Sequence, residues 1–167
     1  MSEKYRTSLV TDGPLDWLPS PNSSVEVALW EGAQYTPIKA PLKTGKLYRL
    51  TVGGIDLTGC SALNLYWGPL SGGLKIGACP LVPSPDAGDF YLDATIVVRC
   101  APGDTLHYIA TAYGVLNTSN QGTIVIAPSK ASIDLGVDAP YLTVTGAPGG
   151  SLKVNATIGL VALEALN

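Results

Sequence analysis

The residues best suited to acid–base or metal chemistry are one histidine and a short run of aspartates. His107 is the only histidine among 167 residues, and imidazole is the side chain that changes charge near neutral pH. Asp86, Asp89 and Asp93 lie within eight positions of one another. Carboxylates on a glycine-bearing loop suit a hard cation such as Ca²⁺, and two of them could form the acid pair of a glycosidase.

Neither pattern is accompanied by the partners that its chemistry requires. No Gly-x-Ser-x-Gly motif supplies a nucleophile for His107, the aspartate spacing does not match an EF-hand loop, and nothing fixes a separation between two carboxylates. A strand histidine and an aspartate that begins a turn are the simpler interpretations. We therefore predict no catalytic residue, no metal site and no cofactor, and a protein that is not an enzyme.

The three cysteines predict buried thiols. Cys60, Cys79 and Cys100 are spaced 19 and 21 residues apart, without a Cys-x-x-Cys pair, so they do not match a zinc site. The start of the chain lacks the apolar stretch of a signal peptide, which favours synthesis in a cytoplasm and reduced cysteines. One disulfide with one free thiol is the alternative.

Aromatic residues at predicted strand ends are the best candidates for binding a ligand. Tyr66 and Trp67 precede the loop Gly68-Pro-Leu-Ser-Gly-Gly73, and Trp30 precedes Glu31-Gly32. Flat rings beside flexible loops can stack on sugar faces if they are exposed. The alternative is that these rings fill the core.

Glycine and proline divide the chain into short apolar runs. The 19 glycines and 13 prolines fall mostly between runs of β-branched and aromatic residues, and breaks every 8 to 16 residues or so are typical of a sandwich or barrel. We predict an all-β fold, an antiparallel β-sandwich or a jelly-roll-like barrel of about ten strands. A single helical turn at 56–60 is the exception, and 162–166 is interpreted as the end of the last strand. The predicted strands are 25–30, 34–39, 46–52, 62–67, 74–78, 90–100, 105–113, 122–127, 141–145 and 151–163.

The first 23 residues are predicted to be an extended N-terminal arm, followed by a β-sandwich domain over 24–167. Three prolines between Thr11 and Ser24 hold the arm extended. Leu15, Trp17 and Leu18 are apolar anchors that a solvated tail does not need. We predict that they bind a partner surface, with folding back onto the domain as the alternative.

Composition narrows the range of partners. Charged residues make up only 14% of the chain, against about 25% in typical proteins, which indicates that part of the surface is covered by another subunit. The net charge is −3 and the basic residues are scattered, so nucleic acid is not an expected partner. No apolar run approaches the roughly 18 residues of a membrane helix, so we expect no membrane partner.

Two segments of the chain have a similar sequence, in which a turn is followed by the start of a strand. Ala101-Pro-Gly-Asp-Thr-Leu106 and Ala147-Pro-Gly-Gly-Ser-Leu152 each place a glycine turn before a buried leucine. These segments, the arm, and the glycine and proline breaks between strands from Val25 to Leu163 carry a resemblance. By these features, the chain resembles the jelly-roll-like virion proteins of tailed bacteriophages, namely head-decoration (cement) proteins and small fibre proteins.

The resemblance implies a function in assembly. It implies a homo-oligomer, with a trimer favoured, located in the virion. Its partner would be the major capsid protein or another virion protein, and its function would be to stabilise the phage head. The alternative function is a carbohydrate-binding or receptor-binding β-sandwich module, with a glycan as ligand.

Overall fold

A computed structural model describes residues 7–10, 23–32, 46–84, 88–101, 103, 107–134, 137–138 and 141–166. This part of the chain forms ten strands joined into one sheet. The strands are β1 (Thr7–Val10), β2 (Val27–Glu31), β3 (Lys46–Trp67), β4 (Leu74–Pro80), β5 (Gly88–Cys100), β6 (His107–Thr118), β7 (Gly122–Val125), β8 (Ala127–Pro128), β9 (Ala131–Asp134) and β10 (Leu142–Ala165).

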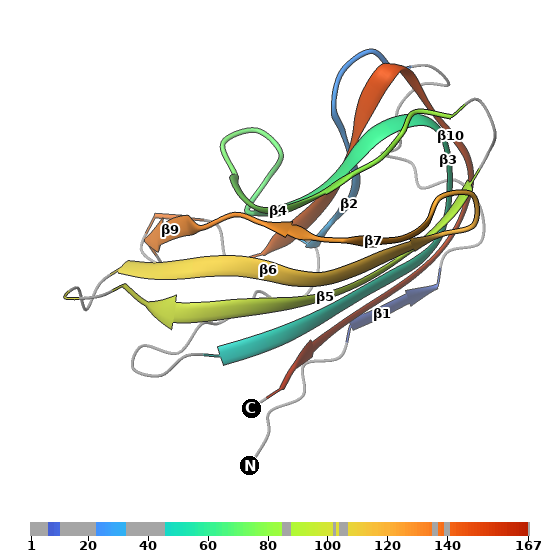
Figure 1. Cartoon of the computed structure of the whole chain (residues 1–167). Helices are drawn as coiled ribbons and strands as arrows, with labels where there is room; N and C mark the ends of the chain where they lie inside the picture. The colour runs from blue at the N-terminus through green and yellow to red at the C-terminus, as the bar shows by residue number, and fades with distance from the viewer. Residues whose placement is uncertain are drawn as a thin grey trace.

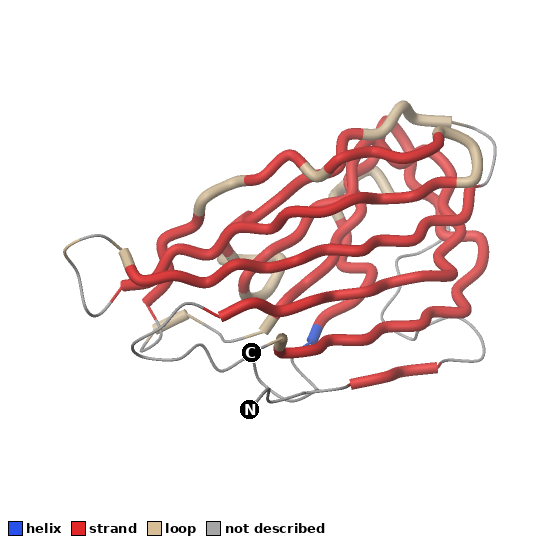
Figure 2. Tube along the Cα trace, turned by 60° about the horizontal axis from the view of Figure 1, so that its bottom comes forward, coloured by secondary structure: helices blue, strands red, loops and turns tan. Residues whose placement is uncertain are grey.

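Two long strands organise the sheet. β3 has 22 residues and β10 has 24, and they pair antiparallel from Trp67↔Leu142 to Tyr48↔Ala165. The resulting ribbon curls from the lower part of the molecule into the upper part (Figure 1). Figure 2 shows the long strands running side by side.

The bent ribbon contributes to two layers. In the lower layer, the first half of β3 pairs with β5, which pairs with β6, while β1 pairs with the second half of β10. In the upper layer, the second half of β3 pairs with β4, and β2 pairs with the first half of β10. β7, β8 and β9 connect the layers, because β7 and β9 pair with β6 whereas β8 pairs with β4. The molecule is therefore a sandwich made by bending one sheet.

A glycine allows β3 to bend without ending. Gly59 has a φ of 70°, in the left-handed region that residues with a Cβ avoid. Its N–H donates to the Ser84 carbonyl, and a Cβ at this position would lie 2.0 Å from the Ser151 carbonyl oxygen. Only glycine fits this contact between β3 and β10.

One hydrophobic core lies between the layers. In β5, Phe90, Leu92, Ala94, Ile96 and Val98 are buried and alternate with more exposed residues, as expected for a strand with one face on a core. The layers approach closely, since a Cβ on Gly77 of β4 would lie 3.1 Å from the Cβ of Ala112 in β6.

The predicted all-β class is confirmed, and some predicted boundaries are wrong. Segments 46–52 and 62–67 belong to one strand, as do 141–145 and 151–163, because bulges and glycines carry both strands through the bend. Residues 56–60, predicted to form a helical turn, lie within β3. The strand predicted at 34–39 lies outside the described residues. In the predicted arm, Thr7–Val10 pairs with β10 and so belongs to the sheet of the body.

Candidate interaction surfaces

The two indoles predicted as stacking residues are in the core. Trp67 is 1% exposed and Trp30 is 3% exposed. Trp67 has the same strand parity as Leu63 and Leu65, which also point into the core. Both rings therefore lie between the layers, where a sugar cannot stack on them, and the core-filling alternative is the one observed.

Tyr66, the third predicted stacking residue, belongs to a polar cluster around Glu26. The Glu26 carboxylate accepts hydrogen bonds from the Asn64 amide at 2.7 Å, the Tyr66 hydroxyl at 3.1 Å and the Thr145 hydroxyl. The Lys75 Nζ lies 5.6 Å from the centre of the Tyr66 ring. Tyr66 is 9% exposed, so its ring is not available as an open platform.

The cluster shifts the pKa values of its members in opposite directions. Burial alone would raise the pKa of Glu26, but hydrogen bonds from Thr145, Asn64 and Tyr66 and the charge of Lys75 lower it overall. Burial and the neighbouring carboxylate raise the pKa of Tyr66 to about 12. Glu26 therefore stays ionised and holds the segment before β2 against β3 and β10.

His107 and the aspartates occupy separate positions. His107 faces Asp134 across the β6–β9 pair, with 4.0 Å between the imidazole Nε2 and the carboxylate. Asp93 binds Arg49, and Asp86 lies outside the described residues. Within the described ranges, no three His, Cys, Asp or Glu side chains are grouped so that they could hold a metal ion.

The described structure contains three free thiols and no disulfide. Cys60 and Cys79 are buried, and Cys100 is partly buried. Burial raises the pKa of both Cys60 and Cys79 to about 11, and the Cys60 thiol donates to the Ala62 carbonyl. Cys60 and Cys79 are therefore buried thiols of low reactivity, as predicted, whereas Cys100 is less buried than predicted.

Three uncharged segments meet where the ribbon bends, and we call them the bend rim: residues 23–25, 80–84 and 147–152. Ser23 and Leu152 exchange two backbone hydrogen bonds of 2.9 and 2.8 Å. Gly149 lies against Pro83, because an added Cβ would be 2.2 Å from the Pro83 Cγ. The three segments therefore form one continuous surface.

The bend rim is apolar and exposed at its tips. Val25 and Val82 are 65% and 72% exposed, and the three segments contain no charged residue. Gln121 fixes the segment at Val82, since its side-chain amide donates to the Val82 carbonyl and accepts from the Val82 N–H, both at 2.8 Å. The exposed valine is thus held on a fixed backbone.

A second surface is the outward side of β3, β5 and β6 in the lower layer, which we call the outer face. Tyr91 and Tyr113 are both close to half exposed, and Leu47 is also exposed. The residues of the outer face form four rows, each with one residue from β3, one from β5 and one from β6. By strand parity and register, the rows are Leu47–Val97–Thr111, Arg49–Thr95–Tyr113, Thr51–Asp93–Val115 and Gly53–Tyr91–Asn117.

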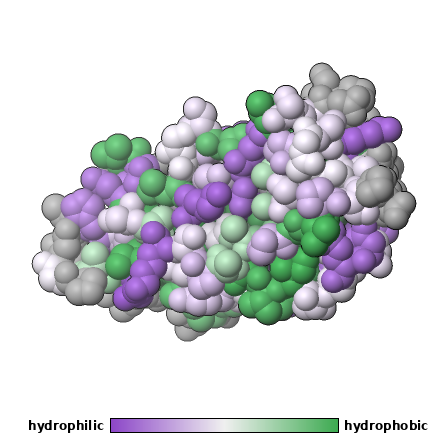
Figure 3. All heavy atoms as spheres, turned by 45° about the horizontal axis from the view of Figure 1, so that its top comes forward, coloured by the Kyte–Doolittle hydropathy of each residue, from purple (hydrophilic) through white to green (hydrophobic). Residues whose placement is uncertain are grey.

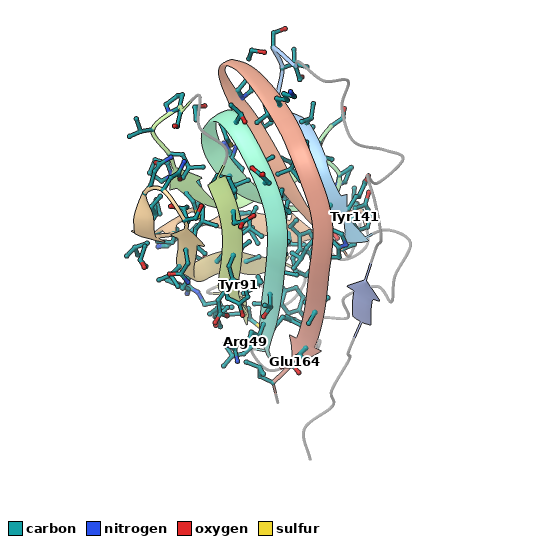
Figure 4. All side chains as sticks on the ribbon, turned by 90° about the vertical axis from the view of Figure 1, so that its right-hand side faces the viewer. Arg49, Tyr91, Tyr141 and Glu164 are labelled. Atoms are coloured by element: carbon teal, nitrogen blue, oxygen red, sulfur yellow. The ribbon has the colours of Figure 1, made fainter. Side chains whose placement is uncertain are left out.

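An ion pair lies within the outer face. The Arg49 guanidinium donates through Nε at 2.9 Å and through Nη2 at 2.7 Å to the two oxygens of Asp93. Hydrogen bonding to Asp93 raises the pKa of Arg49, and the charges of Tyr91 and Glu164 act in the same direction. Figure 4 shows Arg49, Tyr91 and Glu164 towards the same end of the sheet, apart from Tyr141.

The outer face is not among the sites predicted from the sequence, although the sequence contains a signal for it. In 90–100, residues at odd positions are Tyr91, Asp93, Thr95, Val97 and Arg99, whereas those at even positions before Cys100 are apolar. This alternation assigns the odd positions to solvent. The partner strand was harder to recognise because Gly53-Gly54, which has the composition of a turn, follows the predicted strand 46–52.

Leu15, Trp17 and Leu18 lie outside the described residues. In the described part of the chain, no helix has the length and apolar character needed to cross a membrane. The surface seen from the top of Figure 1 has hydrophobic residues in several patches among hydrophilic ones (Figure 3).

Comparison of the chain with family models, curated proteins and solved structures gave no significant match.

Proposed function

We propose that the protein is a non-enzymatic structural component of a virion, a capsid decoration protein that binds the phage head as a homo-oligomer and stabilises it. The observation that carries this proposal is the bend rim, an exposed, apolar and uncharged surface on a fixed backbone. Interface centres are depleted of charge in the same way. The partner we propose is a protein subunit of the shell.

The position of the arm in the sequence supports this use of the rim. The predicted arm, with Leu15, Trp17 and Leu18, ends at Ser23, and Ser23 is bonded to Leu152 within the rim. An arm bound to a neighbouring subunit would bring the rim to the same neighbour. Apolar area buried there would stabilise the assembly by about 25 cal/mol per Å².

The polar side chains of the body support a function without catalysis. Glu26 is engaged by three donors, Arg49 and Asp93 are paired, and the buried thiols have raised pKa values. Groups occupied in this way hold strands together, which suits a protein that acts by binding.

A matched set of variants tests the proposal. Val82→Asp introduces a charge at the rim, and Val137→Asp introduces one at a residue that is 82% exposed outside the rim. We expect Val82→Asp and Trp17→Ala to abolish binding to phage heads that lack the protein, measured by co-sedimentation and electron microscopy. Val137→Asp should bind as the wild type does.

Two results would refute the proposal. One is wild-type protein that fails to bind such heads, and the other is equal binding by Val82→Asp and the wild type. Light scattering after size exclusion tests the oligomer separately, and a trimer is expected.

A further inference from the structure

Tyr91 is the most distinctive side chain of the outer face. It lies directly opposite Gly53 in the β3–β5 register, and a Cβ at Gly53 would be 2.9 Å from the Tyr91 Cδ2 and 3.5 Å from its Cε2. The ring therefore covers the space that a side chain at position 53 would occupy. Tyr91 remains 42% exposed, so the ring is supported by backbone on one side and open to solvent on the other.

Polar groups with fixed positions surround this ring. Asn117 is opposite Tyr91 on the other side, in β6, and its Oδ1 accepts a hydrogen bond of 2.7 Å from Thr123. That bond orients the Asn117 amide, whose NH₂ can donate to a ligand. Along β5, the next residue on this face is Asp93, held by both of its oxygens to Arg49.

A second exposed ring lies further along the same face. Tyr113 is 48% exposed and is opposite Thr95 in β5, four residues beyond Tyr91. At about 3.3 Å per residue along a strand and 4.8 Å between strands, the Cα atoms of Tyr91 and Tyr113 are roughly 14 Å apart. This separation exceeds one sugar ring and suits a short oligosaccharide.

We propose that the outer face binds an uncharged oligosaccharide of β-linked, all-equatorial pyranoses, with one sugar on Tyr91 and another on Tyr113. Such sugars present a flat face of C–H groups that packs on an aromatic ring, while their hydroxyls lie at the rim of the sugar ring within reach of planar polar side chains. Asn117 and the Arg49–Asp93 pair provide these groups beside the rings.

The charges on the face favour an uncharged ligand. Arg49 is already neutralised by Asp93, and Glu164, whose charge also acts on Arg49, adds a further carboxylate. Arg99 at the far end of β5 is offset by Asp89, which is two residues before Tyr91 on the same side of that strand. An acidic sugar would therefore meet more negative than positive charge. This binding activity is separate from the proposed attachment to a virion, which uses the bend rim.

The test uses cellohexaose and chitohexaose as probes, titrated into the full-length protein and followed by ¹H–¹⁵N NMR. We expect at least one probe to shift the amide signals of β5 and β6 around Tyr91 and Tyr113. Tyr91→Ala should weaken binding about tenfold, since one stacked ring contributes up to about 1.5 kcal/mol. Tyr91→Phe keeps the ring and should bind nearly as the wild type does.

Gly53→Ala gives a second test without removing a ring. The new Cβ displaces the Tyr91 side chain, so binding should weaken while Tyr91 is still present. Val82→Asp, at the bend rim, is the matched control and should bind the probe normally. Loss of sugar binding with normal head binding by Tyr91→Ala would separate this inference from the proposed function.

The inference is overturned if neither probe shifts the outer-face signals. It is also overturned if Tyr91→Ala binds as the wild type does, or if polygalacturonate, an acidic polymer, binds this face more tightly than both probes.

Discussion

Replacing Gly59 by alanine tests whether close contact between β3 and β10 at the bend is required for the fold. Gly122 is the matched control, because its φ of 74° is nearly that of Gly59, at 70°. A Cβ on Gly122 would have no atom within 4 Å, whereas one on Gly59 would lie 2.0 Å from the Ser151 carbonyl oxygen. The two variants therefore share the conformational cost and differ in the clash.

The expected magnitudes follow from this comparison. The left-handed conformation costs a residue with a Cβ about 1 to 2 kcal/mol, and we expect Gly122→Ala to lose about that much. At Gly59, reaching even a tight contact of 3.0 Å requires a backbone shift of about 1 Å. Such a shift disrupts the 2.8 Å bond from Gly59 to Ser84 and the bonds of the adjoining Ser23–Leu152 bridge, at about 1 kcal/mol each.

Gly59→Ala should therefore lose about 4 to 5 kcal/mol in all. The assay is equilibrium unfolding in guanidinium chloride at a fixed protein concentration, followed by the fluorescence of the buried tryptophans. Thermal midpoints should fall by about 2 to 4 °C per kcal/mol. Equal losses in the two variants would refute the reasoning, because the contact with Ser151 would then carry no cost.

Three further predictions concern side chains of the body. Because the folded pKa of Glu26 is lowered from 4.5, its carboxylate stabilises the fold above pH 4.5, and this contribution is lost as the pH falls from 4.5 through the lowered pKa. In Glu26→Gln, that part of the decline in the unfolding free energy should be absent, and an unchanged pH profile would contradict the assignment. Trp67→Ala should lose about 3 to 5 kcal/mol in urea unfolding monitored by circular dichroism, and a loss below about 1 kcal/mol would be inconsistent with a core ring. With a pKa of about 11, Cys60 and Cys79 are thiolate in about one molecule in a thousand at pH 8. Mass spectrometry should therefore find iodoacetamide adducts on them only after unfolding. Rapid labelling of the native protein would contradict their burial.

The all-β class and the buried face of a strand such as β5 could be predicted from the sequence, because both depend on the local alternation of apolar and polar residues. The run Phe90 to Cys100 alternates apolar and polar residues, and the structure buries the apolar set. The bend could not be predicted in the same way. Gly53-Gly54 and Pro148-Gly149-Gly150 have the composition of turns, but here they form bulges within continuous strands, since pairing along β3 and β10 compensates for their low strand propensity.

The aromatic residues show why local context misled the prediction of the ligand-facing side chains. Trp67 was a candidate for ligand stacking because it precedes a glycine-rich loop, with core filling as the alternative, and it lies in the core with Leu63 and Leu65, which have the same parity. Tyr91 alternates with Phe90 and Leu92, and the same rule places it outside. Parity separates core-facing from outward-facing side chains along β5, but near the end of β3 Tyr66 has the opposite parity to Trp67 and is also buried.

The bend rim and the outer face lie at different positions along β3. β3 crosses the outer face between Leu47 and Gly53 and meets the rim at Gly59, whose N–H donates to the Ser84 carbonyl. At about 3.3 Å per residue, six residues separate the two surfaces by roughly 20 Å along the strand. A subunit whose contacts stay within the rim would leave Tyr91 accessible. Protein attached to a phage head should bind the probe sugars with the affinity of free protein, and masking of Tyr91 on the particle would mean that the shell covers the outer face instead.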